Sequence, residues 1–228
     1  MTYRLRPTPK LGYFGGPGVF LGEPAAAATV PVFRLDCQAA DCPLPTLADC
    51  QRVLRRAAAD AIQLCLNAAT RLEAHHPSTV QPFIRFFGHV PTRPVPWAGN
   101  KESGAVVAFR FRKVAEALHK RVIHFRCVCA NGGDIAQTNW QAEHNVINLC
   151  AGFWNPPAGL PLSDRFFRAS VVLHEVLHLI FESFFHHQGH QSGDPERRRD
   201  NAHCYDRFAL QLAGHNPPEG TRCTNRLV

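Results

Sequence analysis

Residues 164–181, which read DRFFRASVVLHEVLHLIF, decide how this chain of 228 residues must fold. Their spacing predicts a helix from Asp164 to about Phe185. Apolar side chains surround this helix on almost every side, which is the pattern of a buried helix. Because His174, Glu175 and His178 stand in its middle, three polar groups enter the core and need a partner there. A metal ion satisfies all three.

The two histidines and the glutamate form a His-Glu-x-x-His pattern. Positions four apart on a helix are separated by about 40° around the axis and about 6 Å along it, so both imidazoles can reach one ion. The pattern is typical of zinc peptidases, in which the glutamate takes a proton from a zinc-bound water. It predicts one catalytic Zn²⁺ ion held by His174 and His178, with Glu175 as general base. The competing interpretation is that the histidines are simply hydrogen-bonded in the core or exposed on the helix.

A catalytic zinc ion needs a third protein ligand and an open position for water. We expect this ligand to be His203, which lies on a predicted helix from about Pro195 to Ala213 that carries an apolar stripe. Asp206 or Asp200, one turn away, could orient its imidazole. The alternative ligands lie in the polar loop before this helix and at its start, and they are His186, His187, His190, Asp194 and Asp200.

The remaining sequence predicts an α+β fold that is mostly helical, with a small antiparallel or mixed sheet and the buried helix at its centre. A long amphipathic helix is expected to begin at Pro45 and Thr46 and to end before Pro77. A second helix is expected over Ser103–Lys120, with Phe109 among its buried residues. A period-two pattern predicts a strand at Arg121–Cys129, and a short β-branched run predicts another at Asn145–Cys150, with a turn at residues 131–134 between them.

Length and composition limit the organisation of the chain. With 45% hydrophobic residues it can bury a core, and no stretch approaches the roughly 18 consecutive apolar residues of a membrane span. We expect one domain over residues 46–228, preceded by an irregular arm over residues 1–45 that is rich in proline and glycine. The net charge of +7 comes from scattered basic residues, and Arg197–Arg199 is the one dense run. This is weak support for nucleic-acid binding, so no nucleic-acid partner is expected.

The cysteines and the beginning of the chain bear on its location. Nine cysteines without a Cys-x-x-Cys pair favour disulfides over a cysteine metal site, and the odd number leaves at least one thiol unpaired. The chain begins without the apolar segment of roughly 7–15 residues that marks a secretory signal. Both observations are reconciled by a toxin-like effector that is delivered by a dedicated secretion machinery, or by a domain processed from a larger exported precursor. Its partners would include a secretion apparatus or an immunity protein, and a cytoplasmic location is the alternative.

Several short motifs occur in an order that is similar to a known family. They are Cys50 before a helix, Phe86-Phe87-Gly88, Cys127-Val128-Cys129, Ile147-Asn148-Leu149-Cys150, Phe153-Trp154 and the His-Glu-x-x-His pattern. Over about residues 50–213 the chain resembles the M35 family of zinc endopeptidases, the deuterolysin and peptidyl-Lys metalloendopeptidase group known as aspzincins. The resemblance implies a zincin-like fold, zinc endopeptidase activity, and disulfides that join Cys50 to Cys127 and Cys129 to Cys150.

The chain also departs from that family. The Gly-Thr-x-Asp-x-x-Tyr-Gly segment, which supplies an aspartate ligand and a tyrosine in the family, is absent after His178. Many relatives carry Asn-Ala-Asp-x-Tyr further on, where this chain has Asn201-Ala202-His203-Cys204-Tyr205. The comparison implies a site of three histidines. Tyr205 would either donate a hydrogen bond to the developing oxyanion or serve in packing.

The leading functional hypothesis is a zinc endopeptidase that hydrolyses a protein or peptide substrate through a metal-activated water. The alternative is a catalytically silent binding module that keeps the metal for stability. Relatives that select lysine use an acidic pocket, and the candidates for such a pocket here are Asp134, Glu143 and Asp164, among which the sequence does not choose.

Overall fold

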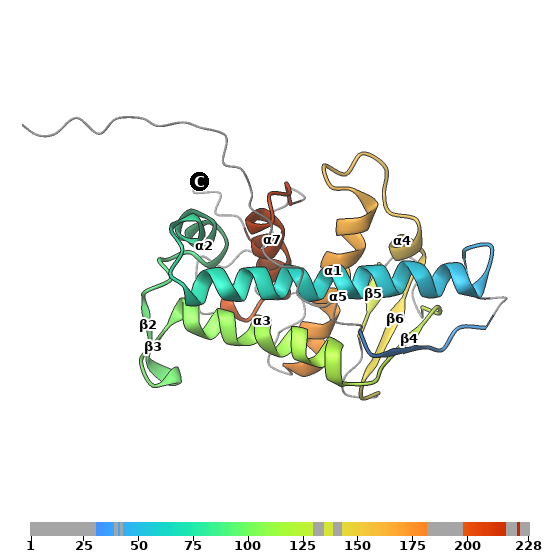
Figure 1. Cartoon of the computed structure of the whole chain (residues 1–228), viewed down its shortest axis with the longest axis horizontal. Helices are drawn as coiled ribbons and strands as arrows, with labels where there is room; N and C mark the ends of the chain where they lie inside the picture. The colour runs from blue at the N-terminus through green and yellow to red at the C-terminus, as the bar shows by residue number, and fades with distance from the viewer. Residues whose placement is uncertain are drawn as a thin grey trace, which may run out of the picture.

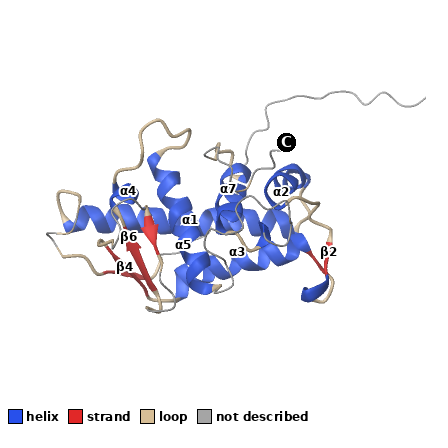
Figure 2. Ribbon diagram, turned by 180° about the vertical axis from the view of Figure 1, so that it is seen from behind, coloured by secondary structure: helices blue, strands red, loops and turns tan. Residues whose placement is uncertain are grey.

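The computed structural model describes residues 31–38, 41, 43–129, 135–138, 143–181, 198–217 and 223. Two long helices run side by side along the molecule, a third helix crosses them, and a small sheet lies at one end (Figures 1 and 2). The helices are α1 (Leu47–Glu73), α2 (Val80–Phe87), α3 (Ser103–Lys120), α4 (Ala151–Trp154), α5 (Asp164–Ile180) and α7 (Ala202–Leu212), with 3-10 turns η1 (Pro77–Thr79) and η2 (Pro96–Ala98). The predicted α+β fold, mostly helical with a small sheet, is confirmed.

Helix α1 begins and ends where its sequence predicts. The Thr46 side chain accepts a hydrogen bond from the backbone N–H of Asp49, which satisfies one of the free donors at the start of the helix. One face of α1 packs on α3 and α5 and is fully apolar except for Asp60, which pairs with Arg165 of α5 at 2.5 Å. Burial of this face therefore fixes α5 across α1.

Helix α3 has the predicted bounds, but the prediction that Phe109 is buried was wrong. The Phe109 side chain is 55% exposed, and the ammonium group of Lys113 lies 5.8 Å from the centre of its ring. Residues four apart share a helix face, and Lys113 also pairs with Glu116 at 2.7 Å. Phe109 thus belongs to the charged, solvent-facing side of α3, while Phe111 points into the core.

The sheet is mixed, with strand order β1-β4-β6-β5. Strands β1, β4 and β6 are parallel, and β5 pairs with β6 in the antiparallel direction. Strand β1 lies inside the segment predicted to be an irregular arm, so that part of the prediction was wrong. The strands are β1 (Phe33–Leu35), β4 (Ile123–Arg126), β5 (Ala136–Gln137) and β6 (Val146–Leu149), and a separate hairpin pairs β2 (Pro94–Val95) with β3 (Lys101–Glu102).

The disulfides correct one of the pairs that the family resemblance implied. Cys127 is bonded to Cys37 and not to Cys50. The reason is the register of the parallel strands: Leu35 lies opposite Phe125, so the cysteines two residues further on face each other, 5.3 Å apart at Cα. The pair Cys129–Cys150 is confirmed. The remaining described cysteines comprise the Cys204–Cys223 disulfide, Cys50, which is also disulfide-bonded, and Cys65, which is free and buried in α1.

An aromatic cluster joins α2, α3 and α7. The rings of Phe83 and Phe87 from α2 pack edge-on against Phe208 of α7, and Phe111 of α3 stacks on Phe208 at a centroid distance of 6.1 Å. Helix α2 ends at Gly88, whose φ of 78° suits a residue without a side chain. This cluster packs α7 against α2 and α3, and α7 also contacts α5. No helix in the described part of the chain is long and apolar enough to cross a membrane.

Candidate metal centre

Helix α5 carries the His-Glu-x-x-His residues into the core, as predicted. His174, Glu175 and His178 are all buried. The helix is shorter than predicted, because it ends at Ile180 rather than at Phe185. Phe181 already has extended backbone angles, and its N–H closes the last helical hydrogen bond to Leu177. His178 therefore lies in the last turn of α5.

His174 and His178 face each other across one turn of α5. Their Nε2 atoms are 3.1 Å apart, and their ring centres are 4.8 Å apart. Two imidazole nitrogens bound to one tetrahedral zinc ion are about 3.3 Å apart, given Zn–N bonds of about 2.0–2.1 Å. The two Nε2 atoms are thus already spaced for a shared ion.

Helix α7 brings His203 to the same place. Asn201 caps this helix, because its side-chain oxygen accepts a hydrogen bond from the backbone N–H of His203 at 3.0 Å. Helix α7 therefore begins at Ala202, later than the predicted Pro195, which lies outside the described residues. The His203 ring is partly buried and its centre lies 4.2 Å from that of His174.

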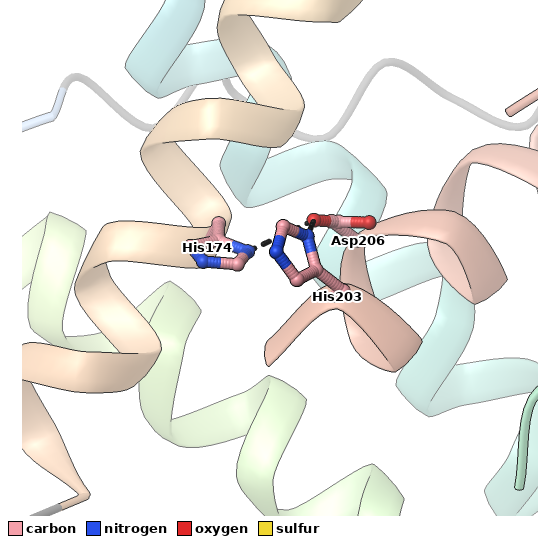
Figure 3. Close-up of side chains that lie close together, drawn as sticks. All are labelled: His174, His203 and Asp206. Atoms are coloured by element: carbon pink, nitrogen blue, oxygen red, sulfur yellow. Dashed lines mark hydrogen bonds and ion pairs between the residues drawn. The ribbon is translucent and has the colours of Figure 1, made fainter. Parts of the chain in front are cut away.

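Asp206, one turn further along α7, contacts both imidazoles (Figure 3). Its Oδ2 atom lies 3.0 Å from Nδ1 of His174 and 3.5 Å from Nδ1 of His203. Burial alone would raise the pKa of Asp206, but its hydrogen bonds with the two histidines outweigh that effect and hold the pKa at about 2. A carboxylate anion therefore sits behind the two rings.

The same contact acts on the two histidines. Burial lowers the pKa of His203 below its usual value, which favours the neutral imidazole. Burial also works against the charged form of His174, but the hydrogen bond to Asp206 outweighs it, so the pKa of His174 is raised. With Nδ1 of each ring turned to the carboxylate, the Nε2 atoms are left to bind a metal, which is how zinc-ligating histidines are commonly oriented.

These donors fit a zinc ion. Ligand atoms of His174, His203 and Asp206 all lie within 4.8 Å of one another. Among the described residues this group does not include His178, whose Nε2 atom lies 3.1 Å from that of His174. Imidazole nitrogens are ligands that zinc accepts, and Asp206, which faces Nδ1 of both rings, is placed to orient them. Of the two orienting residues that the sequence offered, Asp206 takes this place, whereas Asp200 pairs with Arg110 at 2.8 Å. The alternative ligands His186, His187, His190 and Asp194 lie outside the described residues.

Glu175 has a partner that sequence reasoning missed. Its Oε2 atom accepts a hydrogen bond of 2.7 Å from the hydroxyl of Thr138, which follows strand β5. Thr138 carries no motif and follows a strand of two residues, so nothing in the sequence pointed to it.

Tyr205 contacts aromatic rings and Arg110. Its ring is fully buried between Phe87 and Phe111, and its hydroxyl accepts a hydrogen bond of 3.0 Å from Arg110. Burial raises the pKa of this phenol. Of its two sequence-based roles, these contacts match packing.

The acidic residues considered for a specificity pocket are also accounted for where the structure describes them. Glu143 pairs with Arg126 at 2.7 Å, and Asp164 lies 3.5 Å from Arg168. Asp134 lies outside the described residues. Neither of the two described carboxylates is among the residues that group with His174.

Comparison with known proteins identifies a solved structure with a similar fold. No protein-family model matches the chain, and no curated protein does. Among solved structures, it is similar to a zinc peptidase from Grifola frondosa, with 17% sequence identity and a TM-score of 0.53 over 74% of this chain and 99% of that one. A likeness at this level defines the fold class. The chain has the zincin-like fold of a zinc peptidase, with a cluster of metal-binding residue types in its core.

Proposed function

We propose that this protein is a zinc-dependent endopeptidase. The observation that carries the proposal is the pair of Nε2 atoms of His174 and His178, 3.1 Å apart on a buried helix, with Glu175 beside them. Two buried imidazole nitrogens at this distance need either a shared proton or a shared cation. The fold similarity to a zinc peptidase supports the cation.

Three histidines would hold one zinc ion. His174 and His178 would bind it through their Nε2 atoms from α5, and His203, whose Nδ1 atom faces Asp206, would bind it through Nε2 from the first turn of α7. Asp206 would keep both His174 and His203 in the tautomer that binds metal. When bound, zinc would polarise the scissile carbonyl and acidify a water molecule.

Glu175 would move the proton in this reaction. Its Oε2 atom is occupied by the hydroxyl of Thr138, so Oε1 is the atom placed to accept a proton from the attacking water. The same carboxyl group would then return that proton to the leaving amine. The result is hydrolysis of a peptide bond in a protein or peptide substrate.

The disulfides support a setting outside the reducing cytoplasm. Three disulfides are formed among the described cysteines, which favours maturation under oxidising conditions. In this proposal the protein is secreted or delivered, as a toxin-like effector would be. A secretion apparatus and an immunity protein remain its proposed partners.

The test begins with zinc stoichiometry on the purified protein and hydrolysis of an unfolded protein substrate. Glu175→Gln should bind one zinc ion and lose at least about a thousandfold in kcat, because it cannot accept the proton. Glu143→Gln is the matched control, since Glu143 pairs with Arg126 on the surface, and it should keep wild-type kcat.

Three results would count against the proposal in different ways. A folded wild-type protein that binds no zinc and ignores chelators would remove it altogether. A wild-type protein that binds zinc but cleaves no substrate would establish the alternative, a silent module stabilised by metal. Zinc affinity that is unchanged in His203→Ala would move the third ligand to His186, His187, His190 or Asp194.

A further inference from the structure

The hydroxyl of Thr138 makes the closest described contact to the Glu175 carboxylate. The distance from Oγ1 to Oε2 is 2.7 Å, within the range of a hydrogen bond between a hydroxyl and a charged carboxylate. The hydroxyl of Thr138 is the donor and Oε2 of Glu175 is the acceptor. Both side chains are nearly enclosed, Thr138 being 9% exposed and Glu175 8% exposed. Water is therefore poorly placed to replace this hydroxyl.

Thr138 is held in place by the sheet and not by α5. It follows β5, whose Gln137 lies opposite Asn148 of β6. The backbone N–H of Cys150 donates to the carbonyl of Ile135 at 3.0 Å, and Cys150 is cross-linked to Cys129. The hydroxyl thus reaches Glu175 from a strand that is anchored independently of the helix that carries the glutamate.

A glutamate has three rotatable side-chain bonds, and hydrolysis needs one oxygen of Glu175 in a fixed position. A hydrogen bond on Oε2 restricts these bonds and leaves Oε1 directed away from Thr138. Catalytic groups that are misplaced by about 1 Å can lose about a hundredfold in rate. The contact therefore has the geometry of a device that orients the general base.

We propose that Thr138 is a positioning residue that orients Glu175 for proton transfer. This inference rests on the proposed peptidase function. Thr138 touches neither substrate nor metal, and acts only through the carboxylate.

The experiment compares Thr138→Val, which keeps the shape and removes the donor, with Thr138→Ser, which keeps the donor. Thr138→Val should lower kcat by about 10–100-fold with unchanged KM and one bound zinc ion. Thr138→Ser should recover most of the lost kcat. Thr79→Val is the matched control, because Thr79 is also buried but donates its hydroxyl to the His76 carbonyl at 2.7 Å, and it should keep wild-type kcat.

The outcomes separate this inference from the proposed function. If the wild type cleaves peptides and Thr138→Val cleaves them as fast, the positioning role is wrong and the peptidase function stands. A Thr138→Val enzyme with raised KM and normal kcat would also overturn the role. If the wild type binds zinc and cleaves nothing, the proposed function fails first, and the positioning role falls with it.

A second measurement tests the contact without activity. Thr138→Val should lower Tm by about 3–10 °C in the wild-type background, because it leaves a buried carboxylate without its donor. The same change should lower Tm much less when Glu175 is replaced by alanine. Equal shifts in the two backgrounds would show that the hydroxyl and the carboxylate are not coupled, and would overturn the inference.

Discussion

The helical layer and the sheet of this protein are held together by different means. Helices α1, α3 and α5 are long, bury continuous apolar faces against one another, and enclose a cysteine that is not cross-linked. The strands are two to four residues long, and the disulfides Cys37–Cys127 and Cys129–Cys150 lie at their ends. Long amphipathic helices gain enough free energy from apolar burial to stay packed, whereas such short strands also depend on disulfides.

The candidate site draws on both regions. The histidines and Asp206 come from the helical layer, and the donor to Glu175 comes from the sheet. Damage to one region should therefore spare the contribution of the other. The following changes separate the two contributions, beginning with the largest expected effect.

In the helical layer, Phe111→Ala should lower the free energy of unfolding by about 4 kcal/mol, because it opens a cavity between Tyr205 and Phe208. Urea titration measures the loss. Phe109→Ala on the same helix is the control, and it should cost less than about 0.5 kcal/mol since that ring is exposed. Similar losses of stability in the two variants would mean that Phe111 is not on the buried face of α3.

In the sheet, replacing both Cys129 and Cys150 by alanine should lower the free energy of unfolding by about 3 kcal/mol. The bond closes a loop with a sequence separation of 21, and its loss frees the unfolded chain. Zinc stoichiometry should stay at one, because the proposed ligands lie on α5 and α7. Loss of zinc binding in a variant that still folds would contradict this division between the two regions.

Asp206→Asn should weaken zinc binding by about 10–100-fold, since it removes the negative charge that orients His174 and His203. Competition with a coloured chelator gives the affinity. Asp200→Asn is the matched control: it is also close to α7, but its partner is Arg110. Equal affinities for the two variants would rule out an orienting role for Asp206.

Glu116 and Asp206 both have a pKa of about 2, but the carboxyl group of Glu116 is exposed whereas that of Asp206 is buried. For exposed Glu116, hydrogen bonds from Lys113 and then Lys120 lower the pKa from 4.5. Its stabilising effect is therefore complete above about pH 4.5 and is lost as the pH falls towards 2. Water screens the ion pairs of Glu116, so the expected loss of stability on replacing Glu116 is the smallest of the four predicted effects.

The check is Tm from pH 6 to pH 2.5 at low and high salt. Glu116→Gln should remove a small part of the acid-induced fall in Tm at low salt and none of it in about 1 M salt, where charges are screened within about 3 Å. A contribution that survives high salt would show that Glu116 is not exposed in the way described.

The helices were predictable where local signals agreed. The Thr46 cap, the apolar period and Pro77 fix α1, and the His-Glu-x-x-His spacing places three polar residues on one buried helix. The ends of α5 and α7 were less predictable. Asn201 lies inside a polar run that could equally continue a helix, and only tertiary contacts decide where capping occurs.

The contacts between distant segments could not be predicted. Strand β1 is three residues long in a proline-rich segment, so its pairing with β4, and hence the Cys37–Cys127 bond, depends on the assembled sheet. The contact between Thr138 and Glu175 also depends on the assembled sheet, because β5 must pair with β6 to bring Thr138 to α5. Asp206 was expected to orient one histidine, and its contact with His174 as well depends on how α7 packs against α5.

The free thiol of Cys65 provides a chemical probe for the opening of the helical layer. Burial raises the pKa of this thiol far above its usual value, so it is both hidden and protonated in the native state. An alkylating reagent can reach it only when α1 separates from its neighbours. The rate of alkylation would therefore measure how often the helical layer opens, in a protein that needs no introduced cysteine.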